Sequence, residues 1–255
     1  MSNRMIPLLL LATMLSVAGP PAGHAALACA TSAAVWGGFP ALTRSTAALN
    51  AGLPLRIVAL GSSSTAGSGA TAPDRTYPAQ LEQLLRHRFP AARIEIVNRG
   101  RGGETVAANL ARIDRDVLAL QPDLVIWQVG TNDALRGIPL ATIRAGLQEG
   151  ITKLRATGAD VVLLDPQPLN SKIQEAAVER VEALLVDVAN ATKTVLLPRH
   201  RLMDYWVESG QFTPTSLLGP DGLHMTDASY RCLAERIADL FPMPAPPTAR
   251  PAVGQ

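Results

Sequence analysis

A serine block and a late Asp-x-x-His block supply the side chains that nucleophilic acyl transfer requires. Gly61-Ser62-Ser63 follows the apolar run 55–60, and Asp221-Gly222-Leu223-His224 lies near the C-terminus. A serine hydroxyl attacks a carbonyl well only when a neighbouring base removes its proton, and a histidine base needs an acceptor that orients its ring. The two blocks together predict a hydrolase.

Two further polar loops lie between these blocks, and each follows an apolar run. The segment 98–105 follows residues 94–97, and Gly130-Thr131-Asn132-Asp133 follows residues 124–129. The carboxyl ends of parallel strands meet at one edge of a sheet, where the active sites of open α/β proteins form. We therefore expect the polar segments to converge on one rim.

The pattern of apolar residues predicts an α/β fold in which strands and helices alternate. Apolar runs with little alternation are typical of parallel strands covered on both faces, and they occupy residues 56–60, 93–97, 124–129, 160–164 and 194–197. Apolar residues every three or four positions predict helices at 77–89, 104–120, 143–154, 173–188 and 228–240. This alternation implies a three-layer, doubly wound, five-stranded parallel sheet with right-handed crossovers.

Four short blocks occur in order along the chain: Gly61-Ser62-Ser63-Ser64-Thr65, Gly103-Glu104-Thr105, Gly130-Thr131-Asn132-Asp133 and Asp221-Gly222-Leu223-His224. In residue type and order they resemble the motif blocks of the SGNH subgroup of the GDSL esterase/lipase family, over nearly the whole span 55–240. The resemblance implies a flavodoxin-like SGNH hydrolase fold. It also implies an esterase that uses no metal and no cofactor.

The resemblance implies a role for each site residue. Ser63 is the nucleophile, His224 is the general base, and Asp221 is the acceptor that orients the imidazole ring. The oxyanion hole is formed by the backbone N–H groups of Ser63 and Gly103 and by the side-chain amide of Asn132. These roles are physically reasonable, because glycine lets a backbone N–H approach a substrate closely and an amide donates without carrying a charge.

The serine block departs from the family pattern at one position, where Ser62 replaces the usual acidic residue. Ser62 and Ser64 are therefore alternatives to Ser63 as the nucleophile, although the spacing from Gly61 favours Ser63. The replacement also removes a carboxylate that could orient the nucleophile turn.

Other polar residues near the predicted rim are candidates for contacts with substrate. Arg99 and Arg101 flank the oxyanion loop and could bind an anionic group, with a solvated surface position as the alternative. Gln167, in the loop after the fourth strand, could line the pocket. His200 lies between two arginines, so we expect it at the surface.

The two ends of the chain differ in composition from the middle. Arg4, the apolar stretch 6–17 and the small residues before position 26 predict a signal peptide over residues 1–25, with an uncleaved anchor as the alternative. The apolar stretch is shorter than the roughly 20 residues that span a bilayer, so no stable membrane insertion is expected. We therefore predict an N-terminal extension at 26–54, the hydrolase domain at 55–240 and a proline-rich disordered tail at 241–255.

The sequence contains two cysteines, Cys29 and Cys232, and both follow the predicted signal peptide. In an exported protein, whether periplasmic or secreted, an even pair predicts a disulfide. Two free thiols, or a lipid on Cys29, are the alternatives. No His/Cys spacing predicts a metal site.

The net charge of +2 predicts no nucleic-acid partner, because such a partner requires a basic patch. The leading hypothesis is a monomeric serine esterase that forms an acyl-enzyme and takes a small-molecule or glycan ester, with a short acyl group such as O-acetyl on a carbohydrate. A carbohydrate O-acetyltransferase with the same triad is the first alternative. A non-catalytic glycan-binding protein on the same fold is the second, although such a protein needs no triad.

Overall fold

Five parallel strands form one sheet in the computed structural model, which describes residues 29–242. The strands are β1 (Leu55–Gly61), β2 (Ile94–Gly100), β3 (Leu124–Gln128), β4 (Asp160–Leu164) and β5 (Val195–Leu197). Their order is β2-β1-β3-β4-β5 and every neighbouring pair is parallel. The chain therefore moves outward from β1 to β2 and then reverses across β1 to β3, which places a topological switch point at the C-terminal end of β1. The predicted fold class is confirmed.

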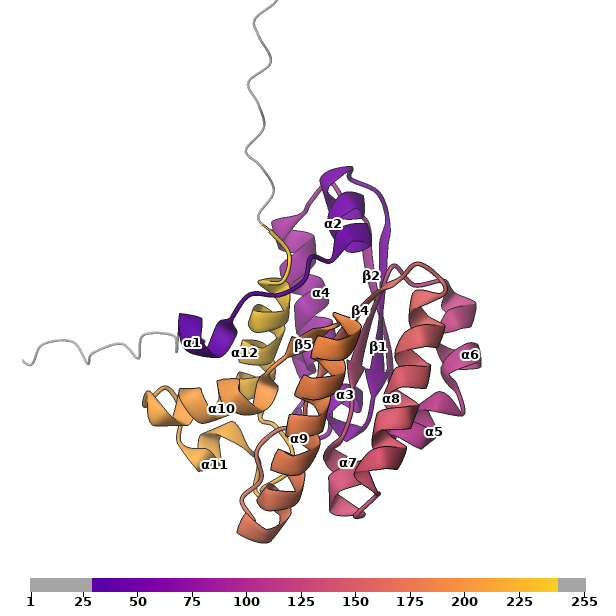
Figure 1. Cartoon of the computed structure of the whole chain (residues 1–255). Helices are drawn as coiled ribbons and strands as arrows, with labels where there is room; N and C mark the ends of the chain where they lie inside the picture. Colours follow the sequence, from indigo (N-terminus) through magenta and orange to yellow (C-terminus); the bar gives the residue numbers. More distant parts are fainter. Residues whose placement is uncertain (1–28, 243–255) are drawn as a thin grey trace, which may run out of the picture.

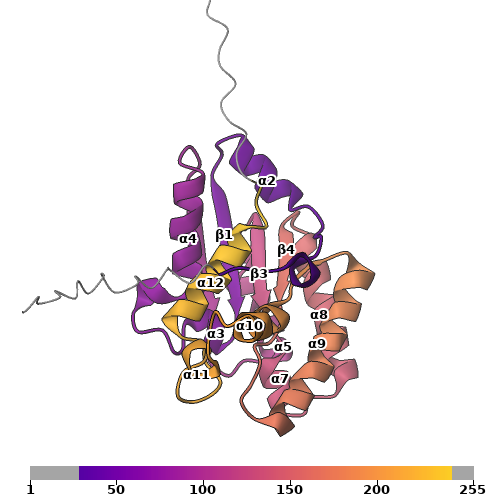
Figure 2. The same cartoon turned by 90° about the vertical axis from the view of Figure 1, so that its left-hand side faces the viewer.

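Helices cover both faces of the sheet, and each face has its own apolar core (Figures 1 and 2). One layer contains α2 (Thr43–Asn50), α4 (Tyr77–Arg88), α10 (Arg199–Glu208) and α12 (Asp227–Ala238), and the other contains α5 (Val106–Leu110), α6 (Ile113–Asp116), α8 (Leu140–Arg155) and α9 (Lys172–Thr192). Along β1, Ile57 faces the first layer and Val58 faces the second. Because both faces are buried, the strand reads as continuously apolar.

The remaining elements are short and lie mainly in the connections. They are α1 (Ala33–Trp36), α3 (Ser63–Ala66), η1 (Pro73–Arg75), η2 (Leu118–Leu120), α7 (Thr131–Leu135) and α11 (Pro214–Leu217). Two of them, α3 and α7, begin immediately after β1 and β3. They therefore present their N-terminal residues at the switch point.

The helix predicted over 104–120 is broken into α5, α6 and η2. Its apolar residues keep helical spacing, but Arg112 leaves the helical conformation at φ −124° and ψ 2°. The Arg112 side chain is only 4% exposed, so it turns inward at the break. A charged group that needs buried partners thus overrides the periodicity of the segment.

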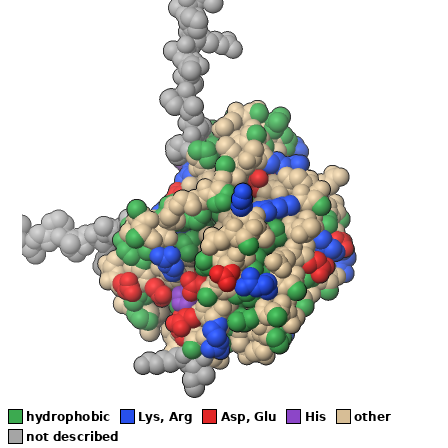
Figure 3. Space-filling view, in the orientation of Figure 1, with side chains coloured by type: hydrophobic (Ala, Val, Ile, Leu, Met, Phe, Trp, Pro, Cys, Tyr) green, Lys and Arg blue, Asp and Glu red, His purple; other side chains and the backbone are tan. Residues whose placement is uncertain are grey.

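The expectation of a surface position for His200 is wrong, because the side chain is 5% exposed. His200 lies in α10, a helix that the apolar pattern did not predict, and contacts carboxylates of α9: its Nε2 is 2.6 Å from Glu175 Oε1 and its Nδ1 is 3.1 Å from Glu182 Oε2. Burial lowers the pKa of His200, but these carboxylates and Asp204 outweigh that effect and raise it to about 9. Acidic side chains gather near a histidine on the face shown in Figure 3.

The segment before β1 is attached to the body of the protein by packing and by a covalent bond. Leu42 and Leu49 belong to the first core, and the Trp206 Nε1–H donates to the Ala30 carbonyl at 3.0 Å. The predicted disulfide joins Cys29 to Cys232 in α12, with 5.1 Å between their Cα atoms. Residues 29–54 of the predicted extension at 26–54 therefore pack against the body of the protein.

The predicted C-terminal boundary needs a correction at one residue. Phe241, assigned to the disordered tail, is 1% exposed and belongs to the first core. A large aromatic side chain just beyond α12 gains more from burial than from solvation. The signal peptide at 1–25 and the tail from 243 lie outside the described residues, and within 29–242 no helix is long and apolar enough to cross a membrane.

Candidate active site

Ser63 is the first residue of α3, directly after β1, and its side chain is partly exposed. Its neighbours Ser62 and Ser64 are 3% and 1% exposed. The tight turn needs glycine at position 61, because a Cβ there would lie 2.4 Å from Thr65 Oγ1 and 2.9 Å from Gln128 Cβ. Of the three serines, Ser63 is therefore the one whose side chain reaches the surface.

The side chains of Ser63, His224 and Asp221 form a continuous chain of contacts. His224 Nε2 is 2.9 Å from Ser63 Oγ, and His224 Nδ1 is 2.5 Å from Asp221 Oδ2. The second carboxylate oxygen, Oδ1, accepts the backbone N–H groups of Leu223 at 3.0 Å and His224 at 2.9 Å. These two bonds fix the carboxylate, and the carboxylate in turn fixes the ring tautomer that leaves Nε2 free to accept a proton.

Asp221 stays ionised despite its place in a turn. The backbone hydrogen bond from His224, followed by those from Leu223 and the imidazole, lowers the pKa of Asp221 to about 2. The side chain is 51% exposed, so solvent also stabilises its charge. An ionised acceptor is what a histidine base requires when it becomes positively charged.

The loop that carries Asp221 and His224 is held at both ends. The Gly219 N–H donates to the His224 carbonyl at 2.7 Å, and Leu218 pairs with Met225 in an antiparallel bridge. Thr226 and Ser229 then form a capping box at the start of α12. His224 is thus fixed between a closed turn and a well-capped helix.

Gln167 supports this loop instead of contacting substrate, which corrects the expectation for that residue. The side chain is 1% exposed, its Nε2 donates to the Leu223 carbonyl at 2.8 Å, and its Oε1 accepts from the Thr131 hydroxyl at 3.3 Å. Both ends of the amide are therefore occupied inside the protein.

Three groups near the C-terminal ends of β1, β2 and β3 are potential oxyanion donors. Among the described residues, the backbone N–H groups of Ser63 and Gly103 have no hydrogen-bond partner. Gly103 has φ +77°, a conformation that favours glycine. The third, Asn132, comes from α7; its Nδ2 donates one hydrogen to the Glu104 carbonyl at 2.9 Å and keeps the other.

Arg99 and Arg101 both turn toward Asp116 in α6. Arg99 Nε donates to the Asp116 carbonyl at 3.3 Å, and Arg101 Nη2 lies 2.8 Å from Asp116 Oδ2. The Arg101 side chain is nevertheless 53% exposed. A role for either arginine in substrate binding stays a prediction.

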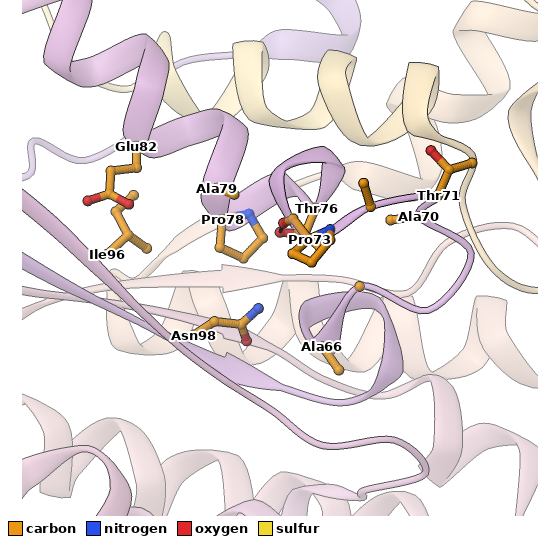
Figure 4. Close-up of a pocket in the computed structure, with 12 residues that line it drawn as sticks. Ala66, Ala70, Thr71, Pro73, Thr76, Pro78, Ala79, Glu82, Ile96 and Asn98 are labelled. Atoms are coloured by element: carbon orange, nitrogen blue, oxygen red, sulfur yellow. Dashed lines mark hydrogen bonds between the residues drawn. The ribbon is translucent and has the colours of Figure 1, made fainter.

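A cavity of about 540 Å³ opens beside α3 (Figure 4). Side chains from β2, α3, η1 and the start of α4 line it, and they include Ala66, Pro73, Pro78, Ile96 and Asn98. The Asn98 amide is already bonded, because it donates to the Thr65 carbonyl and accepts from the Gly100 N–H. Thr71, Thr76 and Glu82 also line the cavity, so its wall is mixed in polarity, and no triad residue lines it.

Sequence reasoning missed the buried polar groups beneath the nucleophile. Gln128 Oε1 accepts from Ser62 N and Ser62 Oγ, each at 2.9 Å, and from Thr65 Oγ1 at 3.3 Å. The Gln128 amide thus orders the turn around Ser62. The signal was a single polar residue inside the apolar run 124–129.

Asp165 and Arg199 form a second buried polar group, below the triad loop. Arg199 is fully buried and its Nε donates to the Asp165 carbonyl at 2.8 Å. Burial raises the pKa of Asp165 to about 7 and lowers that of Arg199 to about 10. Within residues 29–242, no group of three or more His, Cys, Asp or Glu side chains could hold a metal ion.

Comparison with known proteins places this geometry in a family. The model of the non-GDSL lipase-like family matches residues 28–242. An arylesterase of Vibrio mimicus is 26% identical over 184 residues, which cover 72% of this chain and 86% of that protein. Esterase TesA of Pseudomonas aeruginosa is 31% identical over 142 residues, which cover 56% of this chain and 67% of that protein.

Solved structures share the fold. A two-domain esterase active on acetylated mannans superposes with a TM-score of 0.66 at 24% identity. The match covers 81% of this chain but only 57% of that larger protein. Together with the family match over most of the sequence, these findings show that the chain belongs to the non-GDSL lipase-like family and is an ester-hydrolysing enzyme of the SGNH/GDSL type.

Proposed function

We propose that this enzyme is exported and hydrolyses short-chain carboxylic esters, in particular acetyl esters on carbohydrate, through an acyl-enzyme on Ser63. The observation that carries the proposal is the chain of contacts from Ser63 Oγ through His224 to Asp221, at 2.9 Å and 2.5 Å. A general base must lie within about 2.6–3.2 Å of the proton that it removes, and His224 Nε2 meets this condition.

In the first half of the reaction, Ser63 Oγ attacks the ester carbonyl and its proton passes to His224 Nε2. The tetrahedral intermediate collapses, the bond to the alcohol oxygen breaks, and His224 returns the proton to that oxygen. In the second half, His224 removes a proton from water, hydroxide attacks the acyl-serine, and Ser63 leaves with the proton. Asp221 stays ionised and stabilises the imidazolium in both halves.

The negative charge on the carbonyl oxygen develops close to three donors: Ser63 N–H, Gly103 N–H and the free hydrogen on Asn132 Nδ2. Two of these are backbone groups without another partner among the described residues, so they need no reorganisation as the charge forms. Removing one such donor costs about 3–4 kcal/mol of transition-state stabilisation.

Two features favour a small acyl group on a carbohydrate. The segments 61–65 and 221–224, which carry the triad, are short and polar, which suits a small acyl group better than a long lipid chain. The two-domain structural neighbour acts on acetylated mannans. Export is supported by the Cys29–Cys232 disulfide, since such bonds persist in oxidising compartments, and by the signal-like residues 1–25.

The test is hydrolysis of p-nitrophenyl acetate, butyrate and octanoate, and acetate release from acetylated mannan and xylan. We expect kcat/KM to fall with chain length and Ser63→Ala to be inactive with unchanged thermal unfolding. Ser64→Ala serves as the matched control and retains turnover. Faster hydrolysis of octanoate than of acetate would contradict the substrate class, and acetyl transfer to an added sugar in place of release to water would favour the transferase.

A further inference from the structure

Arg112, at the break between α5 and α6, has a guanidinium group that joins three segments of the active-site rim. The side chain is 4% exposed. Its Nη2 donates to the Arg99 carbonyl at 2.8 Å and the Gly61 carbonyl at 3.3 Å, and its Nε donates to Glu104 Oε2 at 2.7 Å. The group therefore ties the C-terminal ends of β1 and β2 to the loop that follows β2.

The buried position of this charge is explained by its partners. An unpaired buried cation is strongly unfavourable, but a guanidinium can fill several acceptors at once with its planar set of donors. Here Nη1 also lies 3.2 Å from Asp116 Oδ2, so two carboxylates and two strand-end carbonyls surround the group. Every nitrogen of Arg112 is engaged.

Glu104 is the residue through which Arg112 reaches the oxyanion hole. It directly follows Gly103, whose N–H is one donor, and its carbonyl accepts from Asn132, whose amide is another. Its carboxylate oxygen Oε2, which Arg112 Nε contacts, also accepts from Asn109 Nδ2 at 2.6 Å. The position of Glu104 therefore sets two of the three donors.

Gly61 is the residue through which Arg112 reaches the nucleophile, because it precedes Ser63 by two positions in a turn that tolerates no Cβ. We propose that Arg112 is a positioning residue of the oxyanion hole. It fixes the Gly103 and Asn132 donors relative to Ser63, so that all three meet the developing oxyanion. The inference rests on the proposed acyl-enzyme mechanism.

A residue that positions the oxyanion donors affects stabilisation of the transition state, whereas a residue that only stabilises the fold does not. Misplaced donors lower kcat while leaving KM nearly unchanged, because the ground-state carbonyl uses them little. They also matter less for a thionoester, whose C=S group accepts hydrogen bonds weakly. The ratio of ester to thionoester kcat/KM therefore reports on the oxyanion hole itself.

The experiment compares Arg112→Met with Arg115→Ala, each as a single change in the otherwise unaltered protein. Arg115 is 70% exposed and its Nε lies 2.7 Å from Asp116 Oδ1, so the control removes a cation from the same carboxylate without touching Gly61 or Glu104. We expect Arg112→Met to lower kcat for p-nitrophenyl acetate about a hundredfold, with KM within about threefold. The ester-to-thionoester ratio should fall at least tenfold, and Arg115→Ala should change neither constant by more than about twofold.

Arg112→Met leaves the partly buried Glu104 carboxylate without its cation, so a second variant controls for misfolding. Glu104→Gln/Arg112→Met removes both charges, and it should fold while showing the same loss of kcat and of the ester preference. An unchanged ester-to-thionoester ratio in every folded variant, or a change confined to KM, would overturn the inference. Absence of ester hydrolysis by the wild-type protein would instead refute the proposed function, so the two failures are distinguishable.

Discussion

Gln128→Leu should destabilise the protein and disorder the turn that presents Ser63. Gln128 Oε1 accepts three hydrogen bonds, two from Ser62 and one from Thr65, while its Nε2 is buried without a partner. Thr65 keeps a second partner in Tyr77, at 3.1 Å. The substitution therefore leaves two donors of Ser62, its N–H and its O–H, without an acceptor. It also removes the Gln128 Nε2 group, which already lacks a partner.

The expected change in the free energy of unfolding follows from the number of buried polar groups left without a partner. Each buried donor left without an acceptor costs about 1–3 kcal/mol, and loss of the stranded Nε2 returns a similar amount. The net cost of Gln128→Leu is therefore that of one such group, about 1–3 kcal/mol. Ser62→Ala alone removes one hydrogen bond and should cost about 1 kcal/mol.

The decisive comparison is the double variant. In the Gln128→Leu background, Ser62→Ala removes one of the two stranded donors, so it should stabilise the protein by about 1–2 kcal/mol. Urea unfolding of the four proteins measures this coupling. Gln80→Leu is the matched control, because Gln80 is a buried glutamine whose Nε2 bonds the Arg75 carbonyl, and Ser62→Ala should cost about the same there as in the wild type.

Additive free energies of unfolding, within about 0.5 kcal/mol, would refute the role of Gln128 as the acceptor for Ser62. Activity gives an independent reading of the same turn. We expect kcat of Gln128→Leu to fall more than that of Ser62→Ala, because only the first change releases the Ser62 backbone N–H.

Three further predictions concern the oxyanion hole, the buried histidine and the disulfide. Asn132→Ala should lower kcat about a hundredfold or more with little change in KM, measured with p-nitrophenyl acetate; a change in KM alone would assign Asn132 to substrate binding. Because the folded-state pKa of His200 is raised to about 9, its contribution to stability is full below the unfolded value of about 6.5 and is lost as pH rises through 9. Unfolding free energies of the wild type should thus fall by about 2 kcal/mol more than those of His200→Gln between pH 6 and 10, and parallel curves would contradict this. Cys29→Ser opens a loop with a sequence separation of 203 residues and should cost up to about 5 kcal/mol in urea unfolding, and equal midpoints for the variant and the oxidised wild type would contradict a closed bond.

The sheet was largely predictable because its strands are continuous apolar runs that no helix pattern imitates. The predicted strand at 160–164 coincides with β4, and the others differ from the structure by at most three residues at an end. The broken helix was not predictable from periodicity, because its apolar residues keep their spacing on both sides of Arg112. What breaks it is a buried charge whose partners come from Gly61, Arg99 and Glu104.

In the candidate site, contacts between residues close in sequence were predictable, and contacts between residues far apart were not. Asp221 and His224 are three residues apart, so a local turn is enough to bring them into contact, and the sequence alone predicts that turn. Gln128 and Ser62 are 66 residues apart, and His200 contacts a helix that ends before β5. Such partners become neighbours only when the sheet assembles, which is why His200, flanked by two arginines, looked like a surface residue.

The disulfide also determines how the protein responds to mechanical load. Cys29 and Cys232 close a covalent ring around β1 to β5 and around every residue of the triad. When tension is applied between the two ends of the oxidised chain, the force passes through the S–S bond and not through the sheet. About 700 Å of extended chain therefore stays hidden until the bond is reduced, so that pulling experiments with and without reductant should differ by that contour length.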